Sequence, residues 1–338
     1  MSRAQSLMNT ETFILFISVF LCFYKTGFTQ SLQQSVQSAL ENNEGLKSQR
    51  VLLDNSYQNY LIQNSTTLPN LSLSSTGTRS SNFDTNQDSD SYSISLNSSY
   101  MLFDFGSLNS KKRSALLLNN ASNLSFKKYE NDVILNVVKV HLELFKAIKI
   151  VELYENSLEI RKQQFLAVKN RFDLGEATRS DLLGAKASIS GAEAQLKVGQ
   201  ANVKKFRERY KTLVGKASTK PLLPKIKTKD PVVLADSIKI GLENDLTLKI
   251  LKLEEQALKE ELNSTEKSRL PNLSLSGALS YGDSQSLGNN SSSGRISLTS
   301  NLTLYSGGQK KAQVKIASNK LAAKTIDIAL RKKLLKQD

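Results

Sequence analysis

The sequence contains no tryptophan, one cysteine, one histidine and five prolines in 338 residues. A zinc site of the usual kind needs about four ligands, drawn mainly from Cys and His, and this chain cannot supply them. The only histidine, His141, also has no nucleophile to activate, because no serine lies in a G-x-S-x-G turn. We therefore predict no catalytic residue, no metal site and no cofactor, and a structural, partly exposed role for His141.

The formal net charge is +15. The sequence contains neither a phosphate-binding loop nor a nucleic-acid-binding pattern that would give this charge a specific role. The segment "GKAST" (215–219) lacks the preceding glycine of a P-loop, and "GGQKK" (307–311) lacks its spacing. The lysines and arginines are interleaved with Glu and Asp through helical stretches, as on a solvated surface. We therefore expect a protein that is not an enzyme and that binds no nucleic acid.

The sequence also lacks any run of about 18 apolar residues, the length that predicts a membrane-spanning helix. Its longest apolar run, "FILFISVFLCFY" (13–24), is shorter and follows Arg3, as in the core of a secretory signal peptide. We expect a signal peptide over residues 1–29, with cleavage before Gln30. Cys22 lies inside this core behind bulky residues, which disfavours lipidation, and the mature chain then has no thiol.

A long internal duplication is present instead. The heptapeptide "LPNLSLS" at 68–74 recurs at 270–276, which is 202 positions later (270 − 68). At the same offset "LFDFG" (102–106) falls on "LYSGG" (304–308). A period of this length indicates a repeated unit of several elements rather than a solenoid. We expect a first repeat over 30–214, a linker rich in proline over 215–235, and a second, incomplete repeat over 236–338.

Each repeat contains a stretch in which apolar and polar residues alternate, the pattern of a strand with one apolar face. The alternation predicts a β-hairpin over 71–105, with a polar loop at 80–90, and another over 273–305, with a loop at 282–294. Strands of about ten residues suit a tilted transmembrane β-strand. The strand positions expected to face lipid are Ile94, Leu96, Leu102, Ile296, Leu298, Leu302 and Leu304. Aromatic residues near the strand ends predict an interfacial girdle: Tyr92, Tyr100, Phe103, Phe105, Tyr281 and Tyr305.

The first hairpin is preceded by a predicted helix over 31–66 and followed by a long helical hairpin over 107–214. Gly175 and a Thr178–Asp181 capping box predict a turn at 172–181 between its two antiparallel helices. The returning helix has a heptad seam formed by Leu182, Ala185, Ile189, Ala192, Leu196, Val203, Phe206, Tyr210 and Leu213.

Four strands cannot close a barrel, and open sheet edges cannot face lipid because their backbone groups would remain unpaired. Several chains would therefore have to pool their hairpins, two giving eight strands and three giving twelve. The residues alone do not choose between these two possibilities.

The duplicated "LPNLSLS", the "LFDFG" ending and above all "RFDLGEATRSDLLGAKASISGAEAQL" (171–196) with "LVG" (213–215) resemble the TolC-like outer-membrane efflux family. The resemblance implies a mainly α fold with transmembrane β-hairpins. In it, long antiparallel coiled-coil helices form an α-barrel tunnel, and the two hairpins contribute to an oligomeric 12-stranded β-barrel. It further implies a homotrimer in the outer membrane that extends into the periplasm and works with a periplasmic adaptor and an inner-membrane pump. The tunnel tip that would meet the adaptor comprises Leu174, Gly175, Glu176, Ala177, Thr178 and Asp181.

The second repeat is shorter than the first. At the offset of 202, Asp338 corresponds to Asn136 (338 − 202), in the middle of the first long helix. Relative to the family we therefore expect a C-terminal truncation that removes the second tip and its returning helix. The function favoured is a passive exit duct for efflux or type I secretion. Two alternatives remain: a periplasmic adaptor-like coiled-coil protein, and a non-functional remnant of a channel.

Overall fold

The computed structural model describes residues 29–82, 84, 87–216, 220–223, 233–284 and 289–337. The expected signal peptide lies outside the described residues except for Thr29, and so does Cys22. The chain divides into two compact units. Unit 1 comprises residues 1–47 and 130–229, and unit 2 comprises residues 48–129 and 230–338.

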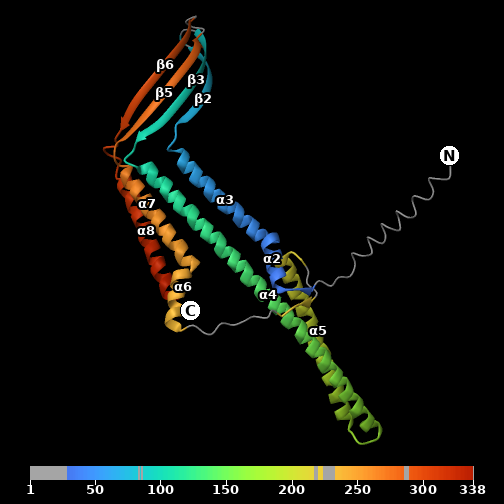
Figure 1. Cartoon of the computed structure of the whole chain (residues 1–338). Helices are drawn as coiled ribbons and strands as arrows, with labels where there is room; N and C mark the ends of the chain where they lie inside the picture. Colours follow the sequence, from blue (N-terminus) through green and yellow to red (C-terminus); the bar gives the residue numbers. More distant parts are fainter. Residues whose placement is uncertain are drawn as a thin grey trace, which may run out of the picture. The chain divides into compact units, whose positions relative to one another are not determined.

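The duplication is visible in the element bounds (Figure 1). In the first repeat the helices α2 (Leu32–Asn42) and α3 (Glu44–Ser65) precede strand β2 (Asn70–Asn82). In the second, α6 (Leu234–Asn244), α7 (Leu246–Lys267) and β5 (Asn272–Ser284) begin and end 202 positions later (for example, 234 − 32). The long helix α4 (Ser107–Asp173) and the helix α8 (Gln309–Leu334) also start at this offset. The repeated letters of the sequence therefore specify a repeated structure.

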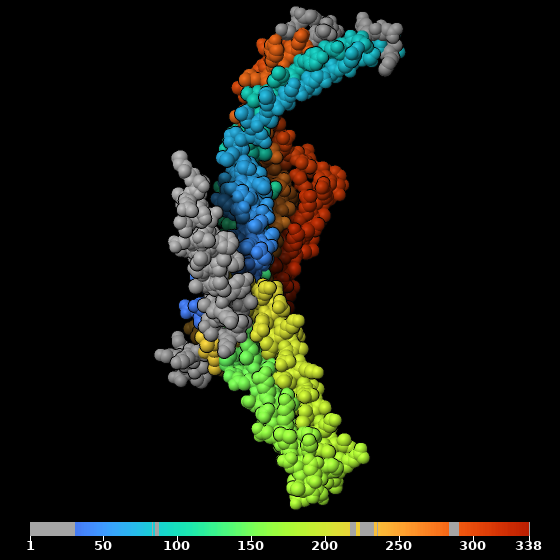
Figure 2. All heavy atoms as spheres, turned by 90° about the vertical axis from the view of Figure 1, so that its right-hand side faces the viewer, coloured from blue at the N-terminus to red at the C-terminus, as the bar shows by residue number. Residues whose placement is uncertain are grey.

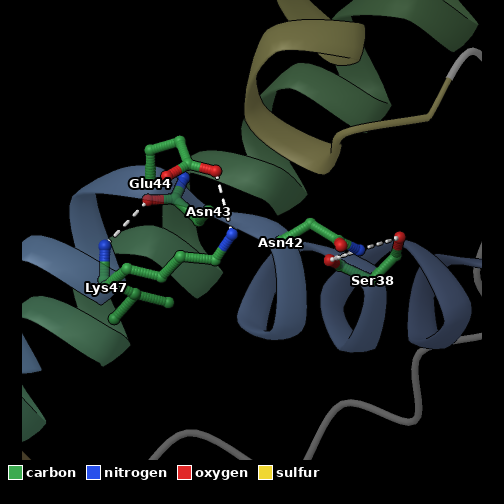
Figure 3. A network of polar contacts seen from close by, with 6 residues as sticks. Ser38, Asn42, Asn43, Glu44 and Lys47 are labelled. Atoms are coloured by element: carbon green, nitrogen blue, oxygen red, sulfur yellow. Dashed lines mark hydrogen bonds and ion pairs between the residues drawn. The ribbon is translucent and has the colours of Figure 1, made fainter.

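The helix predicted over 31–66 is interrupted at Asn43, where α2 ends and α3 begins (Figure 3). Asn43 has an extended backbone, and its side-chain oxygen accepts a hydrogen bond from the Leu46 amide at 3.1 Å. Asn42 donates to the Ser38 carbonyl at 2.9 Å, so the last turn of α2 is also closed by a side chain. Asparagine competes for backbone groups in this way, which is why a helix breaks here without proline or glycine.

In unit 1, α4 and the helix α5 (Arg179–Val214) form the antiparallel pair that the sequence predicts. The buried residues of α4 recur every three or four positions and comprise Val133, Val137, Val140, Leu144 and Ala147. The predicted seam of α5 is confirmed, because each of its positions is buried or half-buried. Gly199 permits a close approach, since a Cβ atom there would lie 3.0 Å from the Tyr154 ring. Two short strands, β1 (Thr29–Gln30) and β4 (Lys220–Pro221), pair in parallel in the same unit.

Unit 2 contains one antiparallel sheet in the order β2-β3-β5-β6, with β3 at Gln87–Phe103 and β6 at Asn289–Asn301 (Figure 1). The two predicted hairpins therefore join through β3 and β5, and β2 and β6 form the edges. The strands extend through most of the polar stretches expected as loops, because backbone pairing continues beyond the apolar alternation. At the other end β6 stops at Asn301, so Leu302 and Leu304 lie beyond the strand on which they were expected.

The helices of unit 2 are joined by polar contacts between α4, α7 and α8. Ser107 of α4 donates to the Ser264 carbonyl at 3.0 Å, and Ser114 donates to the Ala257 carbonyl at 2.8 Å. Small side chains at these positions let α4 and α7 approach closely. No helix in the described part of the chain has an apolar segment long enough to span a bilayer.

Candidate functional site

The register of the sheet gathers the apolar side chains of all four strands on one face. Leu73 of β2 lies opposite Leu96 of β3, which lies opposite Leu279 of β5, and Leu275 lies opposite Leu298 of β6. Directly opposed residues share a face. The face, which we call the apolar face, comprises Leu71, Leu73, Tyr92, Ile94, Leu96, Tyr100, Phe103, Leu273, Leu275, Leu279, Tyr281, Ile296 and Leu298.

Among the described residues, none covers the apolar face. The Ile296 side chain is 84% exposed, and Leu71, Ile94 and Leu298 are also exposed. Soluble monomers rarely expose a contiguous apolar surface of this kind, so the face requires an apolar environment from elsewhere. Of the positions predicted to face lipid, Ile94, Leu96, Ile296 and Leu298 are brought together here, as the alternation indicates.

Leu102 does not lie in the regular alternation of β3. The pairing of β3 with β5 shifts between Met101 and Phe103, so Phe103 rather than Leu102 stands opposite Leu273. Leu102 is the extra residue of a β-bulge, a feature that interrupts alternation and is hard to recognise in a sequence. Its position facing lipid stays a prediction, as do those of Leu302 and Leu304.

Aromatic and charged residues mark the two ends of the apolar face. Tyr92 and Tyr281 lie toward the hairpin loops, and beyond them Arg79 pairs with Asp88 at 2.9 Å and Asp90 at 3.8 Å. At the helical end the Phe103 and Phe105 rings lie 4.8 Å apart, close to the point where α4 begins. The apolar face is therefore a band of finite height between two polar zones.

The opposite face of the sheet is polar. The side chains on this face are almost all Ser, Asn and Thr. A shallow depression of about 520 Å³ on this face is lined by Asn70, Ser72, Asn97, Ser276, Arg295, Ser297 and others. A sheet with one apolar and one polar face can separate lipid from water when it closes on itself.

The turn between α4 and α5 is built as predicted. Gly175 adopts a left-handed backbone with φ of 76°, its amide donates to the Phe172 carbonyl at 2.9 Å, and the Glu176 amide donates to the Arg171 carbonyl at 2.8 Å. This pair of bonds is a Schellman motif, which ends α4. The Asp181 amide donates to the Thr178 hydroxyl at 3.2 Å, and the Thr178 amide donates to the Asp181 carboxylate at 2.9 Å.

The six predicted docking residues lie together in this turn, at the end of the helical pair (Figure 2). Leu174 is 76% exposed, and Ala177 is the only half-buried member of the six. Hydrogen bonds from the Thr178 hydroxyl and amide, aided by the Arg171 charge, lower the pKa of Asp181. The turn therefore presents an exposed leucine on a frame closed by backbone and side-chain hydrogen bonds.

His141 is fully buried, so the prediction of partial exposure is wrong. Its Nε2 lies 2.9 Å from the Leu222 carbonyl, and its Nδ1 lies 3.4 Å from the Ser35 hydroxyl. Ser35 in turn shares a 2.6 Å hydrogen bond with the Tyr210 hydroxyl. This buried polar network joins α2, α4, α5 and the segment after β4 within unit 1. The described residues include no group of three His, Cys, Asp or Glu side chains that could hold a metal ion.

The sequence profile described as "Outer membrane efflux protein" matches residues 35–216, which is more than half of the chain. The chain is 24% identical over 310 residues to the outer membrane efflux protein BepC of Brucella suis biovar 1 (strain 1330), covering 90% of this chain and 67% of BepC. It is 24% identical over 308 residues to the outer membrane protein TolC of Salmonella enteritidis, covering 85% of this chain and 62% of TolC. The chain thus spans about two thirds of the length of these curated relatives.

Among solved structures, the CmeC outer membrane channel of Campylobacter jejuni has the same fold, with a TM-score of 0.78 at 19% identity. The match covers 89% of this chain and 67% of CmeC. Its mainly helical architecture with a small antiparallel sheet agrees with the fold described above. On the match of the sequence profile, this chain belongs to the outer membrane efflux protein family.

Proposed function

We propose that the protein is a subunit of an outer-membrane exit duct, in which three chains pool their strands into a 12-stranded barrel continued by helices in the periplasm. The observation that carries the proposal is the four-stranded sheet with one exposed apolar face and two open edges. Unpaired edges are not tolerated in lipid, whereas closure with neighbouring copies pairs every strand. The family membership supports the outer membrane as its location.

The height of the apolar band supports this placement. Tyr92 and Phe103 mark its two ends on β3, and their partners on β5, Asp283 and Leu273, are ten residues apart (283 − 273) because Leu102 is a bulge. At about 3.3 Å per residue this is about 33 Å along the strand. At a strand tilt of about 40° the band is about 25 Å high, close to the apolar band of outer-membrane barrels.

The duct would act by passage and docking rather than by chemistry. In the proposed complex the α4–α5 turn meets a periplasmic adaptor, with the exposed Leu174 as an apolar anchor, and the adaptor connects the duct to an inner-membrane pump. Efflux is the process named for BepC, and we extend it to this chain as part of the proposal. The adaptor-like alternative gives no role to the apolar face, because an adaptor needs only the helical hairpin.

Cysteine cross-linking tests the pooled barrel. In a chain carrying Cys22→Ser, we would combine Ser297→Cys on the edge strand β6 with Ser72→Cys, Ser74→Cys or Thr76→Cys on the edge strand β2. Oxidation of outer membranes should give cross-linked products of two and three chains and none larger. The matched control is Asn97→Cys with Ala278→Cys, which are direct partners in the central strands and should link only within one chain. Single chains throughout the β2–β6 panel would refute the barrel.

A further inference from the structure

A basic hollow lies where the sheet of unit 2 meets its helices. Its volume is about 630 Å³, and its walls come from the end of α7, the segment after β6 and the start of α8. Four of the lining residues are cations: Lys267, Arg269, Lys310 and Lys311. Glu266 is the only carboxylate among the lining residues.

Several cations farther along the same helix pair form salt bridges, whereas the four cations of the hollow form none with the described residues. Farther along, Lys320 pairs with Glu261 at 3.2 Å, Lys324 with Glu254 at 3.1 Å, and Arg331 with Asp245 at 2.7 Å. Among the described residues, no salt bridge involves any of the four cations of the hollow.

The Lys310 ammonium donates a hydrogen bond to the Ser268 carbonyl at 3.1 Å, which holds it at the wall of the hollow. Four cations around a single carboxylate give the hollow a net positive charge, and an anion that binds here would relieve the repulsion between the cations.

These four positions carry a charge in the second repeat alone. At the offset of 202, the positions of the four cations correspond in the first repeat to neutral residues, namely Ser65, Thr67, Leu108 and Asn109. Both repeats form the same elements at these positions, with α3 ending at Ser65 and α7 at Lys267. The fold itself therefore does not require the charges.

Exposed apolar side chains border the hollow. Leu304 is 89% exposed and Tyr305 is 87% exposed, and Leu302 and Leu270 are also exposed. Leu302, Leu304 and Tyr305 follow the end of β6 at Asn301, and Leu270 precedes β5. An anion that fits both features carries a phosphate and an apolar tail. A free phosphate ion would leave these side chains in water.

We propose that the hollow binds the headgroup phosphate of an anionic phospholipid, with the acyl chains lying against Leu302, Leu304 and Tyr305. This inference rests on the proposed function, because that function places the strand ends at the membrane surface. Lys and Arg near a membrane attract anionic lipids, and Arg and Lys are the usual ligands of phosphate oxygens. Tyr305 fits the polar–apolar boundary, where tyrosine is enriched in membrane proteins.

Lipid binding to the purified full chain in detergent tests the proposal. Phosphatidylglycerol and phosphatidylcholine with identical acyl chains would be titrated separately, and bound lipids counted by native mass spectrometry. We expect one phosphatidylglycerol per chain, bound at least about tenfold more tightly than phosphatidylcholine, since each nearby cation adds to the attraction. Equal affinity for the two lipids would overturn the proposal.

Two variants locate the site. The first replaces the cations by their counterparts in the first repeat: Lys267→Ser, Arg269→Thr, Lys310→Leu and Lys311→Asn. We expect it to lose the preference for phosphatidylglycerol. The single change Lys311→Glu, at an exposed position, keeps the test valid if the first variant does not fold, and we expect it to weaken the preference. Retained preference in folded variants would overturn the site.

The matched control removes the same number of charges from exposed positions of α4 and α5, with Lys162, Lys169, Lys197 and Lys204 each changed to Gln. It should bind phosphatidylglycerol as the wild type does. If this control loses as much affinity for phosphatidylglycerol as the four-cation variant, the effect comes from the total charge of the chain and not from the hollow.

Competition with inorganic phosphate is the third arm of the test. If it displaces phosphatidylglycerol at equal concentration, the hollow is a free-anion site and the lipid assignment fails.

The outcome separates this inference from the proposed function. If cross-linking gives products of up to three chains but the protein shows no preference for phosphatidylglycerol, only the lipid site is refuted. If the preference for phosphatidylglycerol depends on the four cations but no cross-linked products form, the pooled barrel is refuted and the hollow remains an anionic-lipid site.

Discussion

At the scale of single residues, buried polar groups fix the middle of the helical hairpin. His141, Ser35 and Tyr210 are all fully buried, and each has a hydrogen-bond partner. Buried polar groups of this kind are costly when one partner is removed, because the other remains desolvated and unpaired. The network therefore specifies how α2, α4 and α5 fit together in unit 1 more strictly than apolar contacts alone could.

We expect Tyr210→Phe to lower the free energy of unfolding by about 1 kcal/mol, because the 2.6 Å hydrogen bond to Ser35 is lost while the ring is kept and the Ser35 hydroxyl retains its bond to the Ser31 carbonyl. Urea denaturation followed by circular dichroism measures this change. Tyr154→Phe is the matched control, since Tyr154 is a half-buried tyrosine of α4 whose hydroxyl has no hydrogen bond to any of the described residues. Equal stability of the two variants would show that the buried hydrogen bond contributes nothing.

At the scale of elements, alanine substitutions at two glycines measure separately the cost of a left-handed backbone and the gain in helix propensity. Gly175 ends α4 at φ of 76°, whereas Gly184 lies inside α5, and neither has any atom within 4 Å of an added Cβ. We expect Gly175→Ala to destabilise by about 1 kcal/mol, because L-residues disfavour the left-handed region. Gly184→Ala should stabilise by about 0.5–1 kcal/mol. Thermal unfolding of both variants, compared with the wild type, tests the pair, and shifts of the same sign would contradict it.

The contact between α7 and α8 predicts a dependence of stability on pH. Arg331, together with the Leu248 amide, lowers the pKa of Asp245 below its ordinary value of 3.8. A lowered folded-state pKa means that the stabilisation is complete above the ordinary pKa and is lost as the pH falls through the folded-state value. Asp245→Asn keeps a side chain that can cap α7 but removes the charge, and should cost about 1 kcal/mol near pH 7.

Urea unfolding of both proteins between pH 7 and pH 2 measures this effect. The difference between Asp245→Asn and the wild type should shrink below about pH 4, because the wild-type carboxyl is then being protonated as well. Asp327→Asn is the control, since Asp327 makes only a 3.7 Å contact with Lys324 on the surface. A difference that stays constant across the whole pH range would contradict the assigned role of Asp245.

Most elements could be predicted from local patterns. The alternation predicted the apolar face, the heptad spacing predicted the α5 seam, and Gly175 with Thr178 and Asp181 predicted the turn. The errors occur where a side chain or a neighbouring strand overrides the pattern. Asn43 breaks a helix by side-chain hydrogen bonding, and the bulge at Leu102 appears only when β3 is paired with β5.

The basic hollow, unlike these elements, could not be predicted from a local sequence pattern. Its cations lie far apart in the sequence, at 267–269 and 310–311, and only the antiparallel packing of α7 on α8 brings them together. The same holds for His141, whose partners come from three other segments. Sites that depend on long-range packing leave no local signal, although comparison of the two repeats shows that the four positions are neutral in the first repeat.

At the scale of the whole molecule, the proposed duct needs the two faces of its sheet to meet different solvents. Ile296 and Ser297 are neighbours on β6 and lie on opposite faces. Ile296→Lys places a charge in the middle of the apolar band, where lysine costs about 2–4 kcal/mol in a membrane barrel. Ser297→Lys places the same charge on the polar face, where water is available.

We therefore expect Ile296→Lys to reduce the amount of protein recovered in the outer membrane, while Ser297→Lys accumulates there like the wild type. Density-gradient fractionation of membranes with quantitative blotting measures the ratio. Circular dichroism of the purified variants should show unchanged helix content, because the helices are not altered. If both variants reach the outer membrane equally, the apolar face does not meet lipid, and the exit-duct proposal loses the observation that carries it.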